Sequence, residues 1–382
     1  MQETPLNVIT VGSDRALFVP ESSVRARLAE YGTLVDELHI IVFTKRSLGL
    51  VQTQIAPNVW VYPTNSWNRW FYVRDAVRLG KRISKERSIA LVSVQDPFEG
   101  GLAGMRVARS TKARLQIQIH TDLMSPAFQR GSHLNKVRMR IARKVLPQAQ
   151  GIRVVSNRIK ESLSEAFPVL ADRITVLPIF VDIAKMRVTP AAFSVREKYP
   201  QFDWVAITVA RLEPEKNLSL GLHAFARVVE KYPKSGLVLV GEGGERARLE
   251  AEARRLGIGQ NVVFEGARTD VLSYYKTADL FLLTSNFEGY GMALVEAAAA
   301  DCPIVTTDVG VAQDILHNGE ARFMCPVGDA MCLATGMLAL RENTELRKVA
   351  VLKTQSFLEQ FALIDKTEYL KRYRMAWERC LV

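Results

Sequence analysis

The sequence predicts an α/β protein with two doubly wound, Rossmann-like domains in tandem that face each other across a cleft. At 382 residues, the chain is long for a single hydrophobic core. Short apolar segments alternate with helical segments over residues 6–186, and the alternation restarts after a turn-rich segment at residues 188–202. Such alternation is typical of parallel sheets that are covered by helices on both faces.

The N-terminal domain is expected to comprise residues 1–187. Its strands should be short apolar runs bounded by polar or turn-forming residues. They are expected at residues 7–11, 38–43, 59–62, 89–94, 115–119, 151–155 and 174–176.

The C-terminal domain is expected to comprise residues 188–360, followed by a helix within residues 361–382. Its strands are expected at residues 204–209, 236–240, 261–264, 280–283, 303–306 and 321–324. In the final segment, Tyr369, Leu370, Tyr373 and Trp377 recur at helical spacing. We interpret this aromatic stripe as the packed face of a helix.

The composition is that of a globular protein, with 48% hydrophobic and 24% charged residues. No apolar stretch approaches the roughly 20 residues of a membrane-spanning helix, and the N-terminus lacks a basic segment followed by an apolar one. We therefore expect a cytoplasmic protein. The four cysteines lack the paired spacing of a metal site, so we expect reduced, buried thiols at Cys302, Cys325, Cys332 and Cys380.

Positive charge is concentrated in the first half of the chain. The net charge is +11, and residues 1–185 hold 27 Lys and Arg against 15 Asp and Glu. Two helical segments there combine cations with apolar residues at helical spacing. The cations are Arg69, Arg74, Arg78, Lys81, Arg82, Lys85 and Arg87 in the first, and Lys136, Arg138, Arg140, Arg143 and Lys144 in the second. The apolar residues are Trp70, Phe71, Val73, Val77 and Leu79, and Leu134, Val137, Ile141 and Val145.

Three interpretations of these basic helices compete. They could be the solvated outer faces of helices that cover a sheet, a surface for anionic lipid headgroups at the inner face of a membrane, or a nucleic-acid patch. The aromatic residues fall on the apolar faces and do not alternate with the cations, where bases would stack. The nucleic-acid interpretation is therefore the least favoured, and no nucleic-acid partner is expected.

Polar residues follow several expected strands at their carboxyl ends, where ligands collect in open parallel sheets. In the first half these are Gly12-Ser13-Asp14-Arg15, Gln95-Asp96 and His120. In the second half they are the run at residues 210–217, Gly241-Glu242-Gly243 and the loop that contains Glu288.

The most informative run is residues 286–297, which joins a glycine-punctuated turn to an Ala-rich helix. The helix should begin near Gly291 or Met292, and its first backbone N–H groups then favour an anion. Glu288 and Glu296 beside that anion make sense if the ligand also carries hydroxyl groups, whose hydrogens carboxylates accept. The run therefore predicts a site for a phosphate and a polyol. The alternative is that both are ordinary acids at a helix start.

Arg211 and Lys216 flank a turn that contains Pro214, with Asn217 suited to cap the next helix. Two cations at the carboxyl end of a strand would neutralise a diphosphate, and Arg can bind it in bidentate fashion. The alternative is a surface turn in which they pair with Glu213 and Glu215.

These motifs resemble the retaining GT-B glycosyltransferases of family 4. The resemblance rests on Arg211 with Lys216, on Gly241-x-Gly243, on Phe264-Glu265-Gly266 before Tyr274-Tyr275, and on the spacing of Glu288 and Glu296. Asp308-Val309-Gly310 followed by Glu320, and residues 177–182, extend it. Two departures are evident: Ile179-Phe180 replace the usual Asn-Gly, and the loop Gly12-Ser13-Asp14-Arg15 lacks the second glycine of the family's pair.

The resemblance implies a role for each site residue. Arg211 and Lys216 would hold the donor diphosphate, Glu296 the ribose hydroxyls and Glu288 the transferred sugar, and His120 would face the reacting carbon. The predicted catalytic residues are therefore His120, Glu288, Arg211 and Lys216. The remaining predicted donor-binding residues are Gly12, Gly241, Gly266, Gly289, Tyr290, Gly291, Met292, Ala293, Leu294 and Glu296. Acceptor-side candidates are Ser13, Arg15, Gln95 and Asp96, although Asp96 is equally suited to cap a loop. The C-terminal helix would return to the first domain.

The implied activity is transfer of a hexose from a nucleotide-diphosphate sugar to a hydroxyl acceptor, such as a lipid-linked glycan, with retention and without a metal or other cofactor. No paired-aspartate motif for a catalytic divalent ion is evident in the sequence. Two alternatives are a GT-B-type epimerase or phosphorylase and a non-catalytic nucleotide-sugar-binding protein. An alternative use of His120 is as a packed residue at a strand end.

Overall fold

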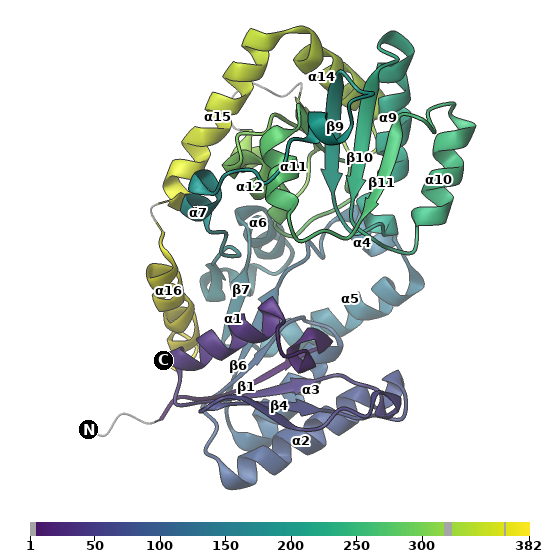
Figure 1. Cartoon of the computed structure of the whole chain (residues 1–382). Coiled ribbons are helices and arrows are strands. Elements are labelled where there is room, and N and C mark those ends of the chain that lie inside the picture. The colour runs from purple at the N-terminus through teal and green to yellow at the C-terminus, as the bar shows by residue number, and fades with distance from the viewer. Residues whose placement is uncertain (1–4, 317–322, 363) are drawn as a thin grey trace. The chain divides into compact units, whose positions relative to one another are not determined.

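The computed structural model describes residues 5–316, 323–362 and 364–382, and the chain divides into two compact units (Figure 1). Unit 1 comprises Met1–Pro178 and Lys366–Val382, and unit 2 comprises Ile179–Asp365. Each unit contains one open sheet with helices on both faces (Figure 1). Glu320, one of the residues on which the family resemblance rests, lies outside the described residues.

Unit 1 contains an eight-stranded sheet of order β3-β4-β2-β1-β5-β6-β7-β8. Its strands are β1 (Asn7–Gly12), β2 (Glu37–Val42), β3 (Thr53–Ala56), β4 (Val59–Pro63), β5 (Leu91–Val94), β6 (Arg114–Ile119), β7 (Gly151–Val154) and β8 (Ile174–Val176). All neighbours pair in parallel except β3, which is antiparallel to β4. The seven expected strands are confirmed. The sequence missed β3 because this short edge strand buries its side chains only in part.

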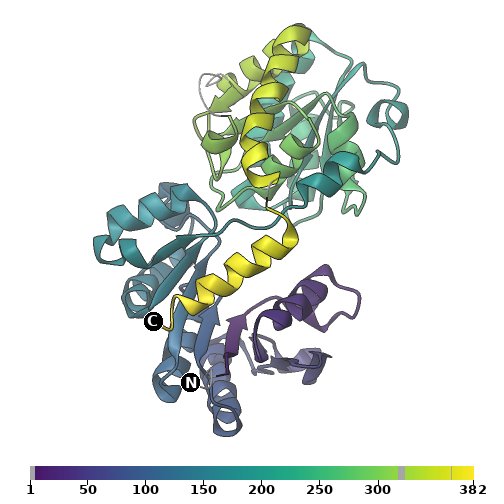
Figure 2. The ribbon, with the colours of Figure 1, turned by 90° about the vertical axis from the view of Figure 1, so that its left-hand side faces the viewer.

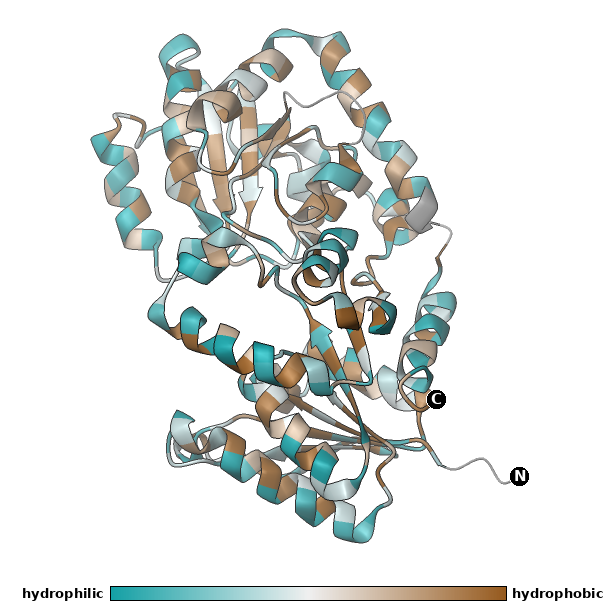
Figure 3. Ribbon diagram, turned by 180° about the vertical axis from the view of Figure 1, so that it is seen from behind, coloured by the Kyte–Doolittle hydropathy of each residue, from teal (hydrophilic) through white to brown (hydrophobic). Residues whose placement is uncertain are grey.

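The helices of unit 1 lie on both faces of the sheet, and all of them except the C-terminal helix lie in the connections between its strands. They are α1 (Ser23–Tyr31), α2 (Tyr72–Glu86), α3 (Glu99–Thr111), α4 (Pro126–Arg130), α5 (His133–Val145), α6 (Asn157–Ala166) and α16 (Lys366–Glu378). In Figure 3, helices alternate hydrophilic and hydrophobic bands, as expected for elements that cover a sheet with one face.

The prediction of the apolar faces of the two basic helices was wrong in part. In α5 the most buried side chains are Met139, Ala142 and Val145, whereas Leu134 and Val137 are exposed. In the turn before α2, Trp70 is 84% exposed. Leu134 and Val137 lie in the first two turns of α5, and Trp70 precedes α2, so these apolar residues come before the buried part of each helix.

Helix α16 lies beside the sheet of unit 1 (Figure 2) and covers a polar patch of that sheet. Gln116 donates to the carbonyl of Ala376 (2.7 Å), and Gln118 donates to the Tyr373 hydroxyl (2.8 Å). Arg153, only 4% exposed, donates to the Tyr369 hydroxyl (3.1 Å). The aromatic stripe is therefore a packed face, as expected, and it packs against polar as well as apolar neighbours.

Unit 2 contains a six-stranded parallel sheet of order β11-β10-β9-β12-β13-β14. Its strands are β9 (Trp204–Val209), β10 (Ser235–Val240), β11 (Val262–Gly266), β12 (Leu280–Leu283), β13 (Ile304–Thr307) and β14 (Met324–Cys325). The first five match the expected strands. The expected strand at 321–324 falls partly outside the described residues, and only Met324 of it lies in β14.

The helices of unit 2 are α7 (Ile183–Val188), α8 (Val195–Lys198), α9 (Leu218–Lys231), α10 (Arg246–Arg255), α11 (Val271–Thr277), α12 (Met292–Ala299), α13 (Ala312–Ile315), α14 (Ala330–Glu342) and α15 (Thr344–Ala362). Of these, α7 and α8 precede the first strand, α9 to α13 alternate with the strands, and α14 and α15 follow the last strand. Helix α9 packs against α14, and α12 packs against α11, α13 and α15.

The division between the units differs from the domain limits expected from the sequence. The expected limits were 187/188 and 360/361, whereas the structure divides the chain after Pro178 and after Asp365. Residues 179–187 belong to unit 2 because α7 packs against α12 and α15. Residues 361–365 stay with unit 2 because α15 continues to Ala362.

Two of the four cysteines form a disulfide, so the expectation of four reduced thiols was wrong. Cys325 and Cys332 are joined, with their Cα atoms 5.7 Å apart. They meet because a short turn carries the chain from β14 into the first turn of α14. Cys302 and Cys380 are free and buried.

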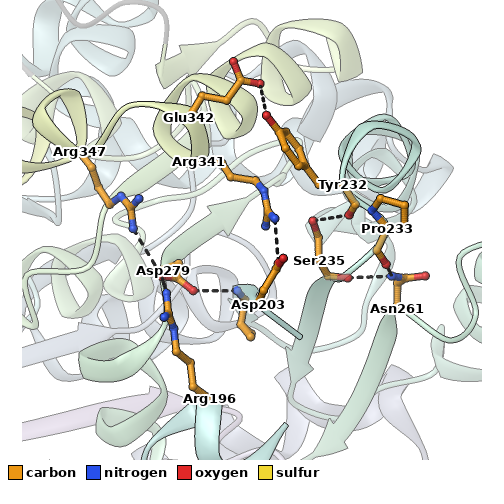
Figure 4. Close-up of polar contacts among 11 residues, drawn as sticks. Arg196, Asp203, Tyr232, Pro233, Ser235, Asn261, Asp279, Arg341, Glu342 and Arg347 are labelled. Atoms are coloured by element: carbon orange, nitrogen blue, oxygen red, sulfur yellow. Dashed lines mark hydrogen bonds and ion pairs between the residues drawn. The ribbon is translucent and has the colours of Figure 1, made fainter. Parts of the chain in front are cut away.

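Polar contacts tie the strands of unit 2 together at their amino ends (Figure 4). Asp279, just before β12, accepts from the backbone N–H of Val205 (2.9 Å) and pairs with Arg196 and Arg347. Arg341 pairs with Asp203 (2.8 Å). These contacts fix the start of β9 relative to β12, so the loops at the opposite, carboxyl edge rise from a rigid sheet.

Candidate functional site

The loop after β12 and the start of α12 form the core of the candidate site. Gly291 adopts φ +88°, a left-handed conformation that favours glycine, and α12 begins at Met292 as the sequence predicted. Its N–H groups at Met292 and Ala293 precede the hydrogen-bond ladder of the helix and point out of its amino end. The backbone carbonyl of Tyr290 accepts from Val311, which ties this loop to the one after β13.

Glu288 is held by two donors on the same carboxylate oxygen. The Nζ of Lys216 lies 2.5 Å from Oε1, and the Ser285 hydroxyl donates to the same atom at 2.7 Å. The side chains of Lys216 and Glu288 are only 18% and 13% exposed. Lys216 therefore pairs with Glu288, and not with Glu213 or Glu215 as the surface-turn alternative required.

The loop that carries Lys216 is joined to the loop that carries Glu288 by further hydrogen bonds. The Thr284 hydroxyl donates to the carbonyl of Lys216 (2.9 Å), and the backbone of Asn286 donates to the carbonyl of Glu215 (2.8 Å). Asn217 donates to the side chain of Asn286 (2.9 Å). The cation and the carboxylate are thus fixed by backbone contacts as well as by their own ion pair, which is a preorganised arrangement.

Arg211 is placed differently from Lys216. Its side chain is 71% exposed and pairs with Glu215 at 2.8 Å, so the surface-turn alternative is confirmed for this one contact. An exposed ion pair is weak, and Arg211 can exchange Glu215 for another anion at little cost.

The glycines expected in the donor site have a packing role in the structure. Gly241 adopts φ +142°, and a Cβ there would lie 1.9 Å from the carbonyl oxygen of Ala210. Its N–H donates to the carbonyl of Gly266 (2.8 Å). These glycines therefore bring the loops after β9, β10 and β11 close together.

Glu296 lies in α12, and a neighbouring helix fixes its carboxylate. The hydroxyl of Tyr275, a residue of α11 that is 1% exposed, donates to Oε2 at 3.0 Å. Burial raises the pKa of Glu296, and this hydrogen bond opposes the rise. Oε1 is the oxygen that Tyr275 does not engage.

In unit 1, the loops after β1 and β5 use their acids as caps. Asp14 accepts from the backbone N–H of Ala16 (3.0 Å), while Ser13 and Arg15 are exposed. Asp96 accepts from the N–H groups of Phe98 (2.7 Å) and Gly100 (3.1 Å) at the start of α3. Burial raises the pKa of Asp96. The capping alternative for Asp96 therefore has direct structural support.

Gly12 and Gln95 lie side by side at the same edge. The N–H of Gln95 donates to the carbonyl of Val11 (3.1 Å), and a Cβ on Gly12 would lie 3.2 Å from the Gln95 side chain. The absence of a side chain at Gly12 thus leaves room for Gln95.

His120 follows β6, and its Nε2 is buried without a hydrogen-bond partner among the described residues. Burial, followed by the charges of Arg153 and Arg27, lowers the pKa of His120 to about 3. The imidazole is therefore neutral at physiological pH. This ring nitrogen therefore remains available for a hydrogen bond with water or with a ligand.

Tyr275, Thr284 and Ser285 were not among the sequence-based candidates. Their hydroxyls hold Glu296, the Lys216 loop and Glu288, respectively. Tyr275 lay within a motif that the resemblance used, but only the fold brings its hydroxyl to Glu296. In the described residues, no group of three or more His, Cys, Asp and Glu side chains gathers in a way that could hold a metal ion.

Two family models match the chain. The model described as Glycosyltransferase Family 4 matches residues 16–185, and the model described as Glycosyl transferases group 1 matches residues 193–356. The first lies largely in unit 1 and the second entirely in unit 2.

Two curated relatives and one solved structure illustrate the similarity. N-acetyl-alpha-D-glucosaminyl L-malate synthase of Bacillus anthracis is 30% identical over 158 residues, which is 41% of this chain and 41% of that protein. Alpha-monoglucosyldiacylglycerol synthase of Streptococcus pneumoniae is 26% identical over 234 residues, which is 58% of this chain and 53% of that protein. These matches span only about half of the relatives' length or less.

The structure of Anabaena HepE in complex with UDP and glucose superposes with a TM-score of 0.77 at 19% identity. The match covers 98% of this chain and 99% of that chain, and at this identity it shows the shared fold.

Proposed function

The chain belongs to glycosyltransferase family 4 and has the GT-B fold, and from this premise we propose that it transfers a hexose from a nucleotide-diphosphate sugar to a hydroxyl acceptor with retention of configuration. The observation that carries the proposal is the pair of joined loops in unit 2, which presents Lys216 and Glu288 beside the amino end of α12. A diphosphate needs cations and helix N–H groups, and a sugar needs carboxylates.

In the proposed reaction, the bond between the anomeric carbon and the donor diphosphate breaks, and a bond forms between that carbon and the acceptor oxygen. The acceptor proton passes to the leaving diphosphate. Negative charge grows on the diphosphate as the sugar becomes oxocarbenium-like. Lys216, Arg211 and the N–H groups of α12 stabilise that charge, and they do so more strongly in the transition state than in the ground state.

The remaining residues orient the donor. Glu296 accepts from ribose hydroxyls through Oε1, because Tyr275 donates to Oε2. Glu288 accepts from hydroxyls of the transferred sugar. Neutral His120 contacts the sugar near its reacting carbon, where an imidazolium would repel the developing positive charge. We propose that these groups act without a metal, because cations and helix amides already neutralise the diphosphate.

The proposal includes an acceptor that is anionic or lipid-borne and a location at the inner face of a membrane. The name of the Streptococcus pneumoniae relative refers to a glycosylated diacylglycerol, and the excess of cations in residues 1–185 supports an anionic partner here. No helix among the described residues is both long and apolar enough to cross a membrane. Retention of the protein on anionic liposomes at low salt, and release at high salt, would test this partner.

The transfer itself is tested by incubating the full chain with a panel of nucleotide sugars in the presence of a chelator and without acceptor. We expect slow release of one nucleoside diphosphate by transfer to water, and loss of that release in Arg211→Ala. The anomer of the free sugar, read by NMR before mutarotation, tests retention. Formation of a sugar phosphate would indicate a phosphorylase, an isomerised donor would indicate an epimerase, and binding without turnover would indicate a binding protein.

A further inference from the structure

Two loops at one corner of unit 1 expose apolar side chains among cations. Trp67 and Trp70, in the loop after β4, are 77% and 84% exposed. Leu48 and Val51, in the loop after β2, are 46% and 71% exposed. We call these two loops, residues 45–51 and 65–70, the tryptophan tip. Large side chains are rarely left so exposed in a small area without a binding role.

The tryptophan tip is held by hydrogen bonds between its two loops. The backbone of Arg46 donates to the carbonyl of Ser66 (2.9 Å), and Ser66 donates back to Thr44 (2.9 Å). Asn65 donates to the carbonyl of Leu50 (2.8 Å), and Asn68 accepts from the backbone of Trp70 (2.9 Å). Because these hydrogen bonds fix the backbone of both loops, the positions from which the two indole side chains extend are also fixed.

The formal charges within the tip are all positive. Residues 38–74 contain no Asp or Glu, and Lys45, Arg46 and Arg69 are exposed within the tip. The next acid, Asp75, is buried and pairs with Arg74 (2.9 Å). The tip itself therefore carries only positive formal charges beside its apolar side chains.

We propose that the tryptophan tip docks onto an anionic lipid bilayer by inserting Trp67 and Trp70 at the headgroup level. Indole rings favour this interface, and the cations attract anionic headgroups. A soluble glycan could stack on the indoles, but it would gain nothing from Leu48 and Val51, which a bilayer accommodates. The inference rests on the proposed membrane partner and locates the contact in these loops, apart from the basic helices.

The position of the tip fits a lipid-borne acceptor. It follows the carboxyl ends of β2 and β4, which run parallel to β1. The loops that hold Gly12, Gln95 and Asp96 leave the same edge of the sheet. A bilayer docked on the tip would therefore lie at the edge of unit 1 where acceptor-side residues are expected.

The test uses the full chain with vesicles of phosphatidylcholine alone or mixed with phosphatidylglycerol, with and without brominated acyl chains. We expect binding to the mixed vesicles at low salt, with a blue shift of tryptophan emission and quenching by the brominated lipid. Trp67→Ala/Trp70→Ala should weaken this binding at least about tenfold and remove most of the quenching. Leu352→Ala, at a site 63% exposed on α15 of unit 2, is the matched control and should bind as the parent does.

A second variant separates charge from insertion. Lys45→Gln/Arg46→Gln/Arg69→Gln should weaken vesicle binding at low salt and make that binding less dependent on salt. The tryptophan emission of the protein that still binds should remain quenched by the brominated lipid. Unchanged vesicle binding of the double tryptophan variant would overturn the proposal and place the contact on the basic helices. Retention on a soluble oligosaccharide that is lost in the same variant would also overturn it, in favour of a glycan site. Release of nucleoside diphosphate without vesicles should be unchanged in all these variants, so failure of docking is distinguishable from failure of the transfer reaction.

Discussion

The carboxyl edges of the two sheets present their polar side chains in contrasting ways. In unit 2, the loops after β9 and β12 are joined by Thr284, Asn217 and Asn286, so that Lys216 and Glu288 are held together at a helix start. In unit 1, the acids of the loops cap their own backbone. Unit 2 therefore fixes a cation and a carboxylate before any ligand binds, and the proposed function assigns this pair to the donor, whereas in unit 1 the acids of the two loops already serve as caps.

The largest effect is expected for Lys216→Ala. The substitution removes a cation from the proposed diphosphate site and leaves the carboxylate of Glu288 without its ion-pair partner. We expect kcat/KM for transfer to fall by about 10²–10³-fold, as for loss of one preorganised group that stabilises a developing anion. Steady-state kinetics with the donor identified from the nucleotide-sugar panel would measure it.

Lys231→Ala is the matched control for Lys216→Ala. Lys231 also pairs with a glutamate, Glu342, but at the end of α9 remote from the loop of Lys216. Its removal should leave kcat/KM unchanged. Similar losses in both variants would mean that the effect reflects general damage to unit 2, and the proposed role of Lys216 would be abandoned.

His120→Asn should reduce kcat about tenfold, within the range for loss of one hydrogen-bonding group in a site. Because the pKa of His120 is lowered to about 3, the parent and the variant should share the same pH dependence of kcat between pH 5 and 8. A limb near pH 6.5 that disappears in the variant would show instead that the imidazole titrates during turnover.

The same histidine predicts a stability difference. An exposed imidazole in the unfolded chain takes up a proton near pH 6.5, whereas the folded chain resists it, so acidification below that value favours unfolding. From this group alone, the free energy of unfolding of the parent should be lower at pH 5 than at pH 8 by up to about 2 kcal/mol. The free energy of unfolding of His120→Asn should fall less over the same pH range, and urea denaturation midpoints would measure the difference.

Tyr275→Phe should raise KM for the donor about fivefold with a smaller change in kcat, since a buried hydrogen bond contributes about 1 kcal/mol. The hydroxyl stabilises the Glu296 anion against the burial that raises its pKa. Without it the pKa of Glu296 rises further, and the acid limb of kcat/KM moves to higher pH. Tyr274→Phe, which alters the neighbouring buried phenol that accepts from Lys198, should leave that limb in place.

The smallest effect on activity is expected for Asp96. Asp96→Ala should lower the free energy of unfolding by about 1 kcal/mol through loss of a cap, and Asp96→Asn by less. Transfer by the folded Asp96→Asn protein should stay within about twofold of the parent. A large loss of activity in Asp96→Asn with unchanged stability would return this residue to the acceptor site and erase the contrast between the two edges.

Much of this architecture could be predicted from the sequence, because apolar runs of strand length and glycine-punctuated turns are local signals. The start of α12 at Met292 and the pairing of sheets with flanking helices follow from such signals. The edge strand β3 does not follow from such signals, because its four residues are only partly buried and because the local pattern does not specify the strand with which they pair.

The supporting residues of the site were beyond local reasoning. The hydroxyl of Tyr275 reaches Glu296 across 21 positions, and Thr284 reaches the Lys216 backbone across 68. The spacing of Trp70 predicts a packed face, yet this residue lies in a turn before α2, because spacing does not show where the packed part of a helix begins. Contacts of long sequence separation depend on the tertiary structure.

The most direct test of the central claim is calorimetric titration of the full chain with UDP and with GDP in the presence of a chelator. We expect one of them to bind at a single site, Lys216→Ala to weaken this binding at least about tenfold, and His120→Asn and Asp96→Asn to leave it unchanged. Equal affinity in the parent and Lys216→Ala, or a loss confined to the unit 1 variants, would contradict the proposal that the diphosphate binds at the preorganised site of unit 2.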